Sequence, residues 1–176
     1  MHVAVTAVGR DRPGIVAAVS KVLHGAGCNI EDSRMAILGG HFSMMLIVAL
    51  PTDTGADALE EALGEPARAL DLVVSVRPVA EAAPELAEGQ PFVVSVYGAD
   101  HPGIVARVTA LLADHRVNIS DLATHVVGGE PPVYVMVMEV VLPAGADPGG
   151  IEADLKALAS ELEVDVSMRP MEPETF

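Results

Sequence analysis

One segment of the chain occurs twice, and this duplication constrains the fold more than any other feature. The residues from Gly9 to Ala17, GRDRPGIVA, return from Gly98 to Ala106 as GADHPGIVA, at an offset of 89 residues. Asn29-Ile30 falls on Asn118-Ile119 at the same offset. A period this long is far above that of stacked solenoid units, so it indicates two similar domains and not a repeat array.

The repeat also predicts how the chain is divided. We expect a first domain over residues 1–79, a linker over 80–90, a second domain over 91–170 and a tail over 171–176. The linker segment is acidic, rich in alanine and carries one proline, which suits a connection between domains. The last few residues are expected to fray.

The same order of strand and helix patterns occurs in each repeat. In the first, Val3–Val8 is short and β-branched, which predicts a strand that ends at Gly9. The apolar spacing after Pro13 predicts one face of a helix, stopped by Gly25 and Gly27. The elements expected next are strands 29–38 and 41–50 joined at Gly39-Gly40, a helix 56–64 broken or kinked near Pro66, and a strand 72–77 that ends at Pro78.

The second repeat follows the first, and its second helix is expected to start near Asp147-Pro148. The order βαββαβ, found twice, predicts an α+β chain of two ferredoxin-like domains. Each would have a four-stranded antiparallel sheet with two helices on one face.

Two strand segments are apolar on more than one face. Residues 44–50 are apolar throughout, and residues 133–142 nearly so. In an antiparallel sheet with one solvent-exposed face, apolar and polar residues should alternate along each strand. We therefore expect the face away from the helices to be covered, by sheet faces that pack on each other in a homodimer.

The duplicated segment joins a strand to a helix and has the chemistry of a small-molecule cradle. Pro13 suits the first helical turn, with Asp11 or Arg12 as the cap, so that the N–H groups of residues 14–16 have no intrahelical partner. Those groups and the helix dipole attract a carboxylate, and Gly14 allows close approach. Asp11 suits an ammonium group, which points to an α-amino acid. The alternative is that the loop is only a sharp turn, which duplication would copy as well.

The side chain of Asn29 offers both a hydrogen-bond donor and an acceptor. Together with Asn29-Ile30, the first loop segment resembles the ACT domain, and the second segment does so together with Asn118-Ile119. The resemblance covers both units. It implies amino-acid binding where the strand-to-helix loop of one domain meets the start of the second strand of a neighbour. By position, the expected ligand-binding residues are Gly9, Asp11, Arg12, Pro13, Gly14 and Ile15 with Asn29 and Ile30, and Gly98, Asp100, His101, Pro102, Gly103 and Ile104 with Asn118 and Ile119.

The copies differ where Arg10 becomes Ala99 and Arg12 becomes His101. If only one loop senses a ligand, the more positive first loop is favoured. Two such domains with no enzyme attached are similar to the glycine cleavage system transcriptional repressor group. This likeness implies a non-enzymatic regulator that binds a small amino acid of the glycine or serine class and modulates a partner, in that group a transcriptional activator. The alternatives are a ligand-free assembly or adaptor module, and a regulatory subunit of an amino-acid or one-carbon enzyme.

Composition excludes several other classes. The formal net charge of −15 argues against direct contact with nucleic acid, which needs a basic surface. No apolar run reaches the roughly 18 residues of a transmembrane helix, and the start lacks a basic signal-peptide region, so we expect a cytoplasmic protein with no membrane contact.

Motifs for catalysis and metal binding are also missing. Cys28 is the only cysteine, so an intrachain disulfide cannot form. The six histidines show no metal-ligand spacing, and neither a nucleophile elbow nor a phosphate-binding loop is present. We therefore expect no catalytic residue, no metal and no cofactor.

Overall fold

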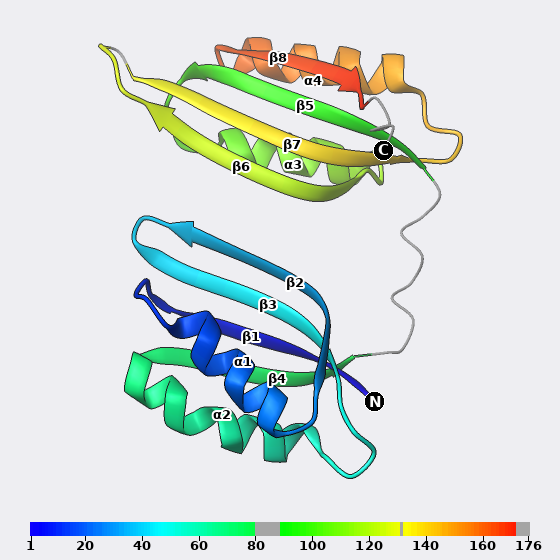
Figure 1. Cartoon of the computed structure of the whole chain (residues 1–176). Helices are drawn as coiled ribbons and strands as arrows, with labels where there is room; N and C mark the ends of the chain where they lie inside the picture. The colour runs from blue at the N-terminus through cyan, green and yellow to red at the C-terminus, as the bar shows by residue number, and fades with distance from the viewer. Residues whose placement is uncertain (80–88, 131, 172–176) are drawn as a thin grey trace. The chain divides into compact units, whose positions relative to one another are not determined.

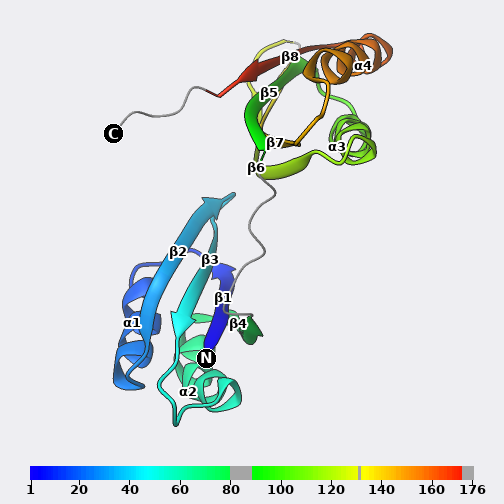
Figure 2. The ribbon, with the colours of Figure 1, turned by 90° about the vertical axis from the view of Figure 1, so that its right-hand side faces the viewer.

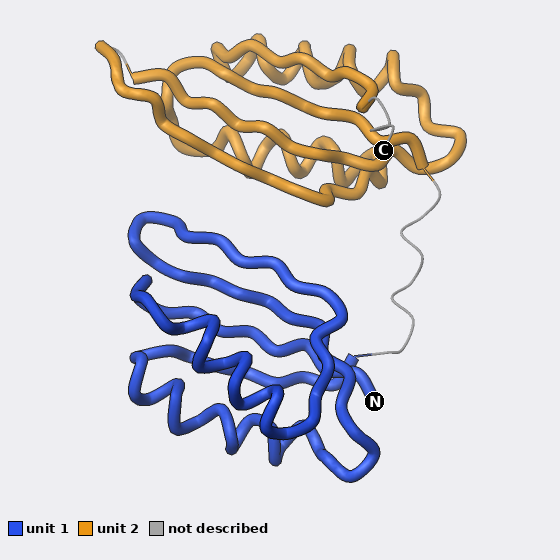
Figure 3. Tube along the Cα trace, in the orientation of Figure 1, with its two compact units in different colours: residues 1–83 blue, residues 84–176 orange. Residues whose placement is uncertain are grey.

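The computed structural model describes residues 1–79, 89–130 and 132–171. The chain divides into two compact units, residues 1–83 and 84–176 (Figure 3). Residues 80–88 of the expected linker and residues 172–176 of the expected tail lie outside the described residues. Strand β5 begins at Gly89, inside the range expected for the linker.

Each unit has the order βαββαβ. The first contains β1 (His2–Arg10), α1 (Ile15–Gly25), β2 (Asn29–Leu38), β3 (His41–Ala49), α2 (Ala56–Leu70) and β4 (Leu72–Val79). The second contains β5 (Gly89–Ala99), α3 (Ile104–Asp114), β6 (Asn118–Val127), β7 (Val133–Pro143), α4 (Pro148–Glu161) and β8 (Val164–Pro170). The predicted element order is therefore confirmed.

The strands form two separate four-stranded sheets, in the orders β2-β3-β1-β4 and β6-β7-β5-β8. Every neighbouring pair is antiparallel. The two helices of each unit cover one face of its sheet (Figures 1 and 2). The predicted α+β class with two ferredoxin-like units is confirmed.

Each core lies between the sheet and its helices. In β1, Val3, Val5 and Ala7 alternate with outward residues and are fully buried. The helices add residues at spacings of four, which place apolar side chains on one stripe. These helix residues are Ile15, Val19 and Leu23 in α1, and Leu59, Leu63 and Ala67 in α2. Burying one such leucine contributes roughly 1.5–3 kcal/mol. Among the described residues, no helix is long and apolar enough to span a bilayer.

Two expected strand ends are wrong. Gly9 does not end β1, because it still pairs with Phe42 of β3 and Leu72 of β4. Pro78 does not end β4, because it pairs with Val3 and the strand continues to Val79. Since β4 is an edge strand, a proline there can sit without removing a hydrogen bond of the ladder.

The predicted break near Pro66 is also wrong. Helix α2 continues through Pro66 to Leu70. Leu59 and Leu63 are buried before the proline and Ala67 after it, so both halves of the helix are held on the same sheet. This packing outweighs the missing hydrogen bond and the clash that a proline brings to a helix interior.

We predict that Pro66→Ala stabilises the protein. Alanine restores the N–H that can bond to the preceding turn, and we expect a gain of about 1–2 kcal/mol in the free energy of unfolding. Urea denaturation followed by circular dichroism measures it. The control is Pro148→Ala, because Pro148 stands in the first turn of α4, where its N–H has no helical partner. A loss of stability in the Pro66 variant alone would contradict the packing argument.

Candidate functional site

The two duplicated loops share one backbone design. In the first, Gly14 is the N-cap of α1 with φ 97° and ψ −7°, and in the second, Gly103 is the N-cap of α3 with φ 102° and ψ −9°. A residue with a Cβ is strained in this left-handed conformation, so the position favours glycine. The prediction that Asp11 or Arg12 caps α1 is wrong, and Pro13 precedes the helix instead of lying in its first turn.

Both helices begin with free N–H groups. The first intrahelical bond of α1 runs from the N–H of Ala18 to the carbonyl of Gly14 at 2.9 Å, and in α3 Arg107 bonds to Gly103 at 3.0 Å. No side chain caps either helix. A Cβ placed on Gly14 or Gly103 would meet no atom within 4 Å, so a small anion has room to approach. Such a helix start attracts anions through its N–H groups and its dipole.

The predicted site residues in these loops divide into two groups. The side chains of Asp11 and Asp100 are exposed beside the helix starts. The side chains of Ile15 and Ile104 are only 2% exposed and lie in the cores, so these two residues can offer a ligand only their backbone. The loops therefore present a carboxylate and main-chain N–H groups together.

Gly9 and Gly98 have a packing role. A Cβ on Gly9 would lie 2.6 Å from the carbonyl oxygen of Asp71, and a Cβ on Gly98 would lie 2.9 Å from the Cα of Val164. Both distances are too short for real atoms. These glycines let the last strand of each unit pass closely beside the central strand where the loop begins.

The first loop is also fixed to the β2–β3 hairpin. The N–H of Asp11 donates a hydrogen bond of 3.0 Å to the carbonyl oxygen of Gly40, at the tip of that hairpin. Gly40 is not among the site residues predicted from the sequence. The available signal was the repetition of Gly39-Gly40 as Gly128-Gly129 at the offset of the loops.

His101 makes the second loop different from the first. Its Nε2 lies 2.7 Å from the carbonyl oxygen of Leu162, just after α4, and its Nδ1 lies 3.3 Å from the carbonyl of Pro102. An imidazolium can donate to both carbonyls. The pKa of His101 is raised above the usual 6.5, mainly by the hydrogen bond to Leu162 and next by the one to Pro102. The charges of Asp100 and Glu163 raise this pKa to a smaller extent, whereas desolvation lowers it. The imidazole thus joins the loop to the end of α4.

Asn29 and Asn118 do not lie beside the loops of their own units. Asn29 pairs with Ala49, which pairs with His2 at the start of β1, whereas the loop follows the other end of β1. The seven steps from His2 to Gly9, at about 3.4 Å each, place these ends about 24 Å apart in a strand. The same holds in the second unit, where Asn118 pairs with Val141 beside Pro91. One unit alone cannot bring its loop and its asparagine to one ligand.

The surroundings of the two asparagines also differ. In the first unit a β-bulge between Ile30 and Asp32 inserts Glu31, whose Oε2 lies 3.0 Å from Nε2 of His2. The corresponding positions of the second unit hold Ser120 and Pro91. The pattern of the sequence gave no reason to pair His2 with Glu31, because a bulge changes which face a side chain takes.

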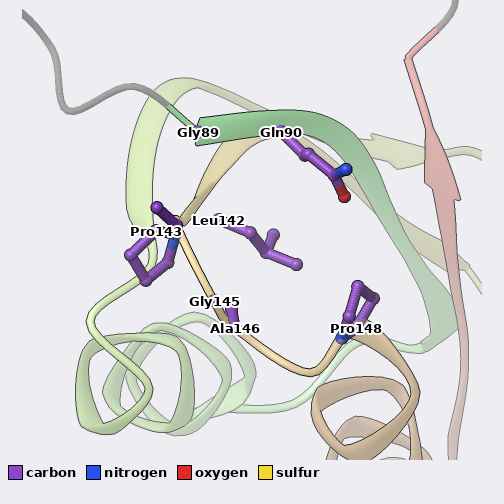
Figure 4. A pocket seen from close by; sticks show the side chains of 8 residues that line it. Gly89, Gln90, Leu142, Pro143, Gly145, Ala146 and Pro148 are labelled. Carbon is purple, nitrogen blue, oxygen red and sulfur yellow. The ribbon is translucent and has the colours of Figure 1, made fainter.

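A cavity of about 360 Å³ opens at the asparagine end of the second unit (Figure 4). Its lining is mostly small or apolar, and the amide of Gln90 is its polar side chain. The lining residues are Gly89, Gln90, Leu142, Pro143, Ala144, Gly145, Ala146 and Pro148. This cavity is not predictable from the sequence, because the loop after β7 that lines it has no recognisable motif.

We predict that His101 stabilises the protein in a pH-dependent way. Because the pKa of His101 is raised in the folded state, its contribution is complete below the pKa of unfolded histidine and is lost as the pH rises through the folded pKa. The stability lost by His101→Gln should therefore be larger at roughly pH 5.5 than at roughly pH 8.5. Urea denaturation at the two pH values tests it, with His125→Gln, on an exposed histidine, as the control. Equal losses at both pH values would contradict the assignment.

Comparison with known proteins agrees with this architecture. The family model of the ACT domain matches residues 1–77 and 90–169. The chain is 33% identical over 171 residues to the glycine cleavage system transcriptional repressor of Escherichia coli, which covers 95% of this chain and 88% of that relative. A protein of unknown function from Galdieria sulphuraria, 30% identical, superposes with a TM-score of 0.79 over 97% of this chain and 98% of its own. A crystal structure assigned as a glycine cleavage system transcriptional repressor, 23% identical, shares the fold with a TM-score of 0.75 over 97% of each chain. The chain is a member of the ACT domain family, with two such domains in tandem.

Proposed function

We propose that this protein is a non-enzymatic regulator that binds a small amino acid at its duplicated loops. The observation that carries the proposal is the uncapped helix start behind a left-handed glycine, with open space above it, present in both units. The free N–H groups suit the carboxylate of the ligand. The neighbouring Asp11 or Asp100 suits its ammonium group.

The ligand class follows from this chemistry. A carboxylate and an ammonium group on adjacent atoms are the shared part of every α-amino acid, and the loops supply a partner for each. The loops add no apolar pocket for a large side chain, because Ile15 and Ile104 are turned into the cores. A small ligand of the glycine or serine class is therefore favoured.

The positions of Asn29 and Asn118 support a site completed by a second ACT domain. All ten residues of the edge strand β2 are exposed, and such an edge can pair with another strand. Antiparallel pairing of two such edges would set the asparagine of one domain beside the loop of the other. Met35 and Ile37, on the helix side of β2, are 49% and 55% exposed and would add apolar contact.

The regulatory step needs a ligand that favours one state of the protein. Binding at a site shared by two domains meets this condition, because the ligand then stabilises the assembled form over the separated one. The name of the Escherichia coli relative, a transcriptional repressor, supports a role in transcriptional regulation. We propose that the partner is a transcriptional regulator in the cytoplasm. With a net charge of −15, the chain would act on that partner and not on DNA directly. The alternative functions are a regulatory subunit of a partner enzyme and a ligand-free adaptor.

We predict that the full chain binds glycine or L-serine and that Asp11→Asn and Asp100→Asn each weaken one site. The amide keeps the shape but loses the charge, and a hydrogen bond to a charged group is worth about 1.5–3 kcal/mol, or roughly 10- to 100-fold in affinity. Titration calorimetry measures affinity and stoichiometry. Thermal unfolding is a second readout, because a ligand at 100 times its Kd adds about 2.7 kcal/mol of stability.

The control is Asp57→Asn, which makes the same change at an exposed position in the first turn of α2. It should leave binding unchanged. The absence of heat and of thermal stabilisation with all twenty amino acids at millimolar concentration would refute the sensor and favour the adaptor. Unchanged binding in both loop variants would place the ligand elsewhere.

A further inference from the structure

The sheet face of the first unit that lies away from its helices carries several large apolar side chains that are exposed. We call it the first face. Strand register places Thr6, Val8 and Met45 on it, because Thr6 pairs with Met45 and both alternate with buried residues. Its exposed large side chains are Val8 at 50%, Leu38 at 76%, Met45 at 49% and Val73 at 76%.

The corresponding face of the second unit, the second face, has the same character. Tyr97 of β5 pairs with Val135 of β7 and with Asp165 of β8, all on the side away from α3 and α4. Its exposed large side chains are Tyr97 at 50%, Val127 at 54%, Val133 at 42% and Val137 at 39%. Exposed apolar residues that are contiguous over a sheet mark an interaction surface.

The two faces differ in shape. The first face carries a shallow hollow of about 390 Å³, lined by residues that include Thr6, Val8, Ala36, Ser43 and Met45. On the second face, the position equivalent to Val8 holds Tyr97, a large aromatic side chain that is half exposed. Buried tyrosines are common anchors of protein interfaces. The hollow on the first face and the Tyr97 side chain on the second face are complementary in shape.

The two faces also differ in charge. The first face carries three arginines, accompanied by Asp32 and by the Glu31 that pairs with His2. These arginines are Arg10, Arg34 and Arg77. The second face carries three carboxylates and one arginine, namely Asp121, Glu139, Asp165 and Arg169. Unlike faces bring opposite charges together, whereas two second faces would place carboxylates against each other.

We propose that the first face of one copy packs against the second face of another copy, and the reverse, in a closed two-fold dimer. Four strands spaced about 4.8 Å apart, with eight residues each, give a face of roughly 500 Å² in projection. Two reciprocal pairs of faces bury roughly 2,000 Å², the upper part of the range for a stable interface. The dimer covers both apolar faces, which explains strands that are apolar on more than one side. This proposal is independent of the amino-acid sites.

The experiment measures the mass of the full chain by analytical ultracentrifugation over a range of micromolar concentrations. We expect a dimer for the wild type and at least a tenfold weaker dimer for Tyr97→Arg. Met45→Arg tests the hollow and should act in the same direction. Ala110→Arg puts the same charge on the exposed side of α3 and should leave the dimer intact. Circular dichroism checks that every variant is folded.

Charge reversal distinguishes unlike from like packing. If the first face meets the second, Arg77→Glu weakens the dimer, and adding Asp165→Arg restores part of the affinity. If first faces meet each other, Arg77→Glu relieves repulsion between two arginines and tightens the dimer instead. A monomeric wild type, or a Tyr97→Arg variant that remains as dimeric as the wild type, would overturn the proposal.

Discussion

The pairing of the central strand with two neighbours decides where every candidate site residue lies. Strand β1 bonds to β3 on one side and to β4 on the other, and β5 does the same in the second unit. The loop follows the end of the central strand. Because β3 runs antiparallel to β1 and β2 runs antiparallel to β3, β2 is parallel to β1 and starts at the end opposite the loop. The distance between a loop and its own asparagine is therefore a consequence of topology. Our proposal of a site completed by a second ACT domain rests on that separation.

The sequence allowed the order of elements to be predicted because each repeat checks the other. Apolar periodicity located α1 and α3, and the glycine pair located the hairpin. The errors came from places where tertiary packing overrides a local rule. Pro66 remains in α2 because Leu63 and Ala67 are buried on either side of it, and Gly9 stays in its strand because a neighbouring strand needs the space. The contact of His101 with Leu162 joins residues 61 positions apart, and local pattern carries no information about it.

Duplication has kept the backbone of the two units and changed the side chains around the sites. Both loops use a left-handed glycine as the N-cap, with φ angles that differ by only 5°. Around this common frame, Arg12 is replaced by a histidine bound to the end of a helix, and the His2–Glu31 pair is replaced by a proline and a serine. The two halves of the chain thus share their backbone fold and differ in the charges around the loops.

The crowding at Gly9 and the left-handed turn at Gly14 have a consequence for how such a loop can diverge. Backbone geometry leaves little choice at these two positions, and Ile15 is held in the core. The two units differ instead on either side of the retained aspartate, where Arg10 and Arg12 of the first unit are replaced by Ala99 and His101 of the second. The charge of the loop can therefore change at two positions while the backbone of the loop stays the same. A tandem chain can carry two such versions and lose neither.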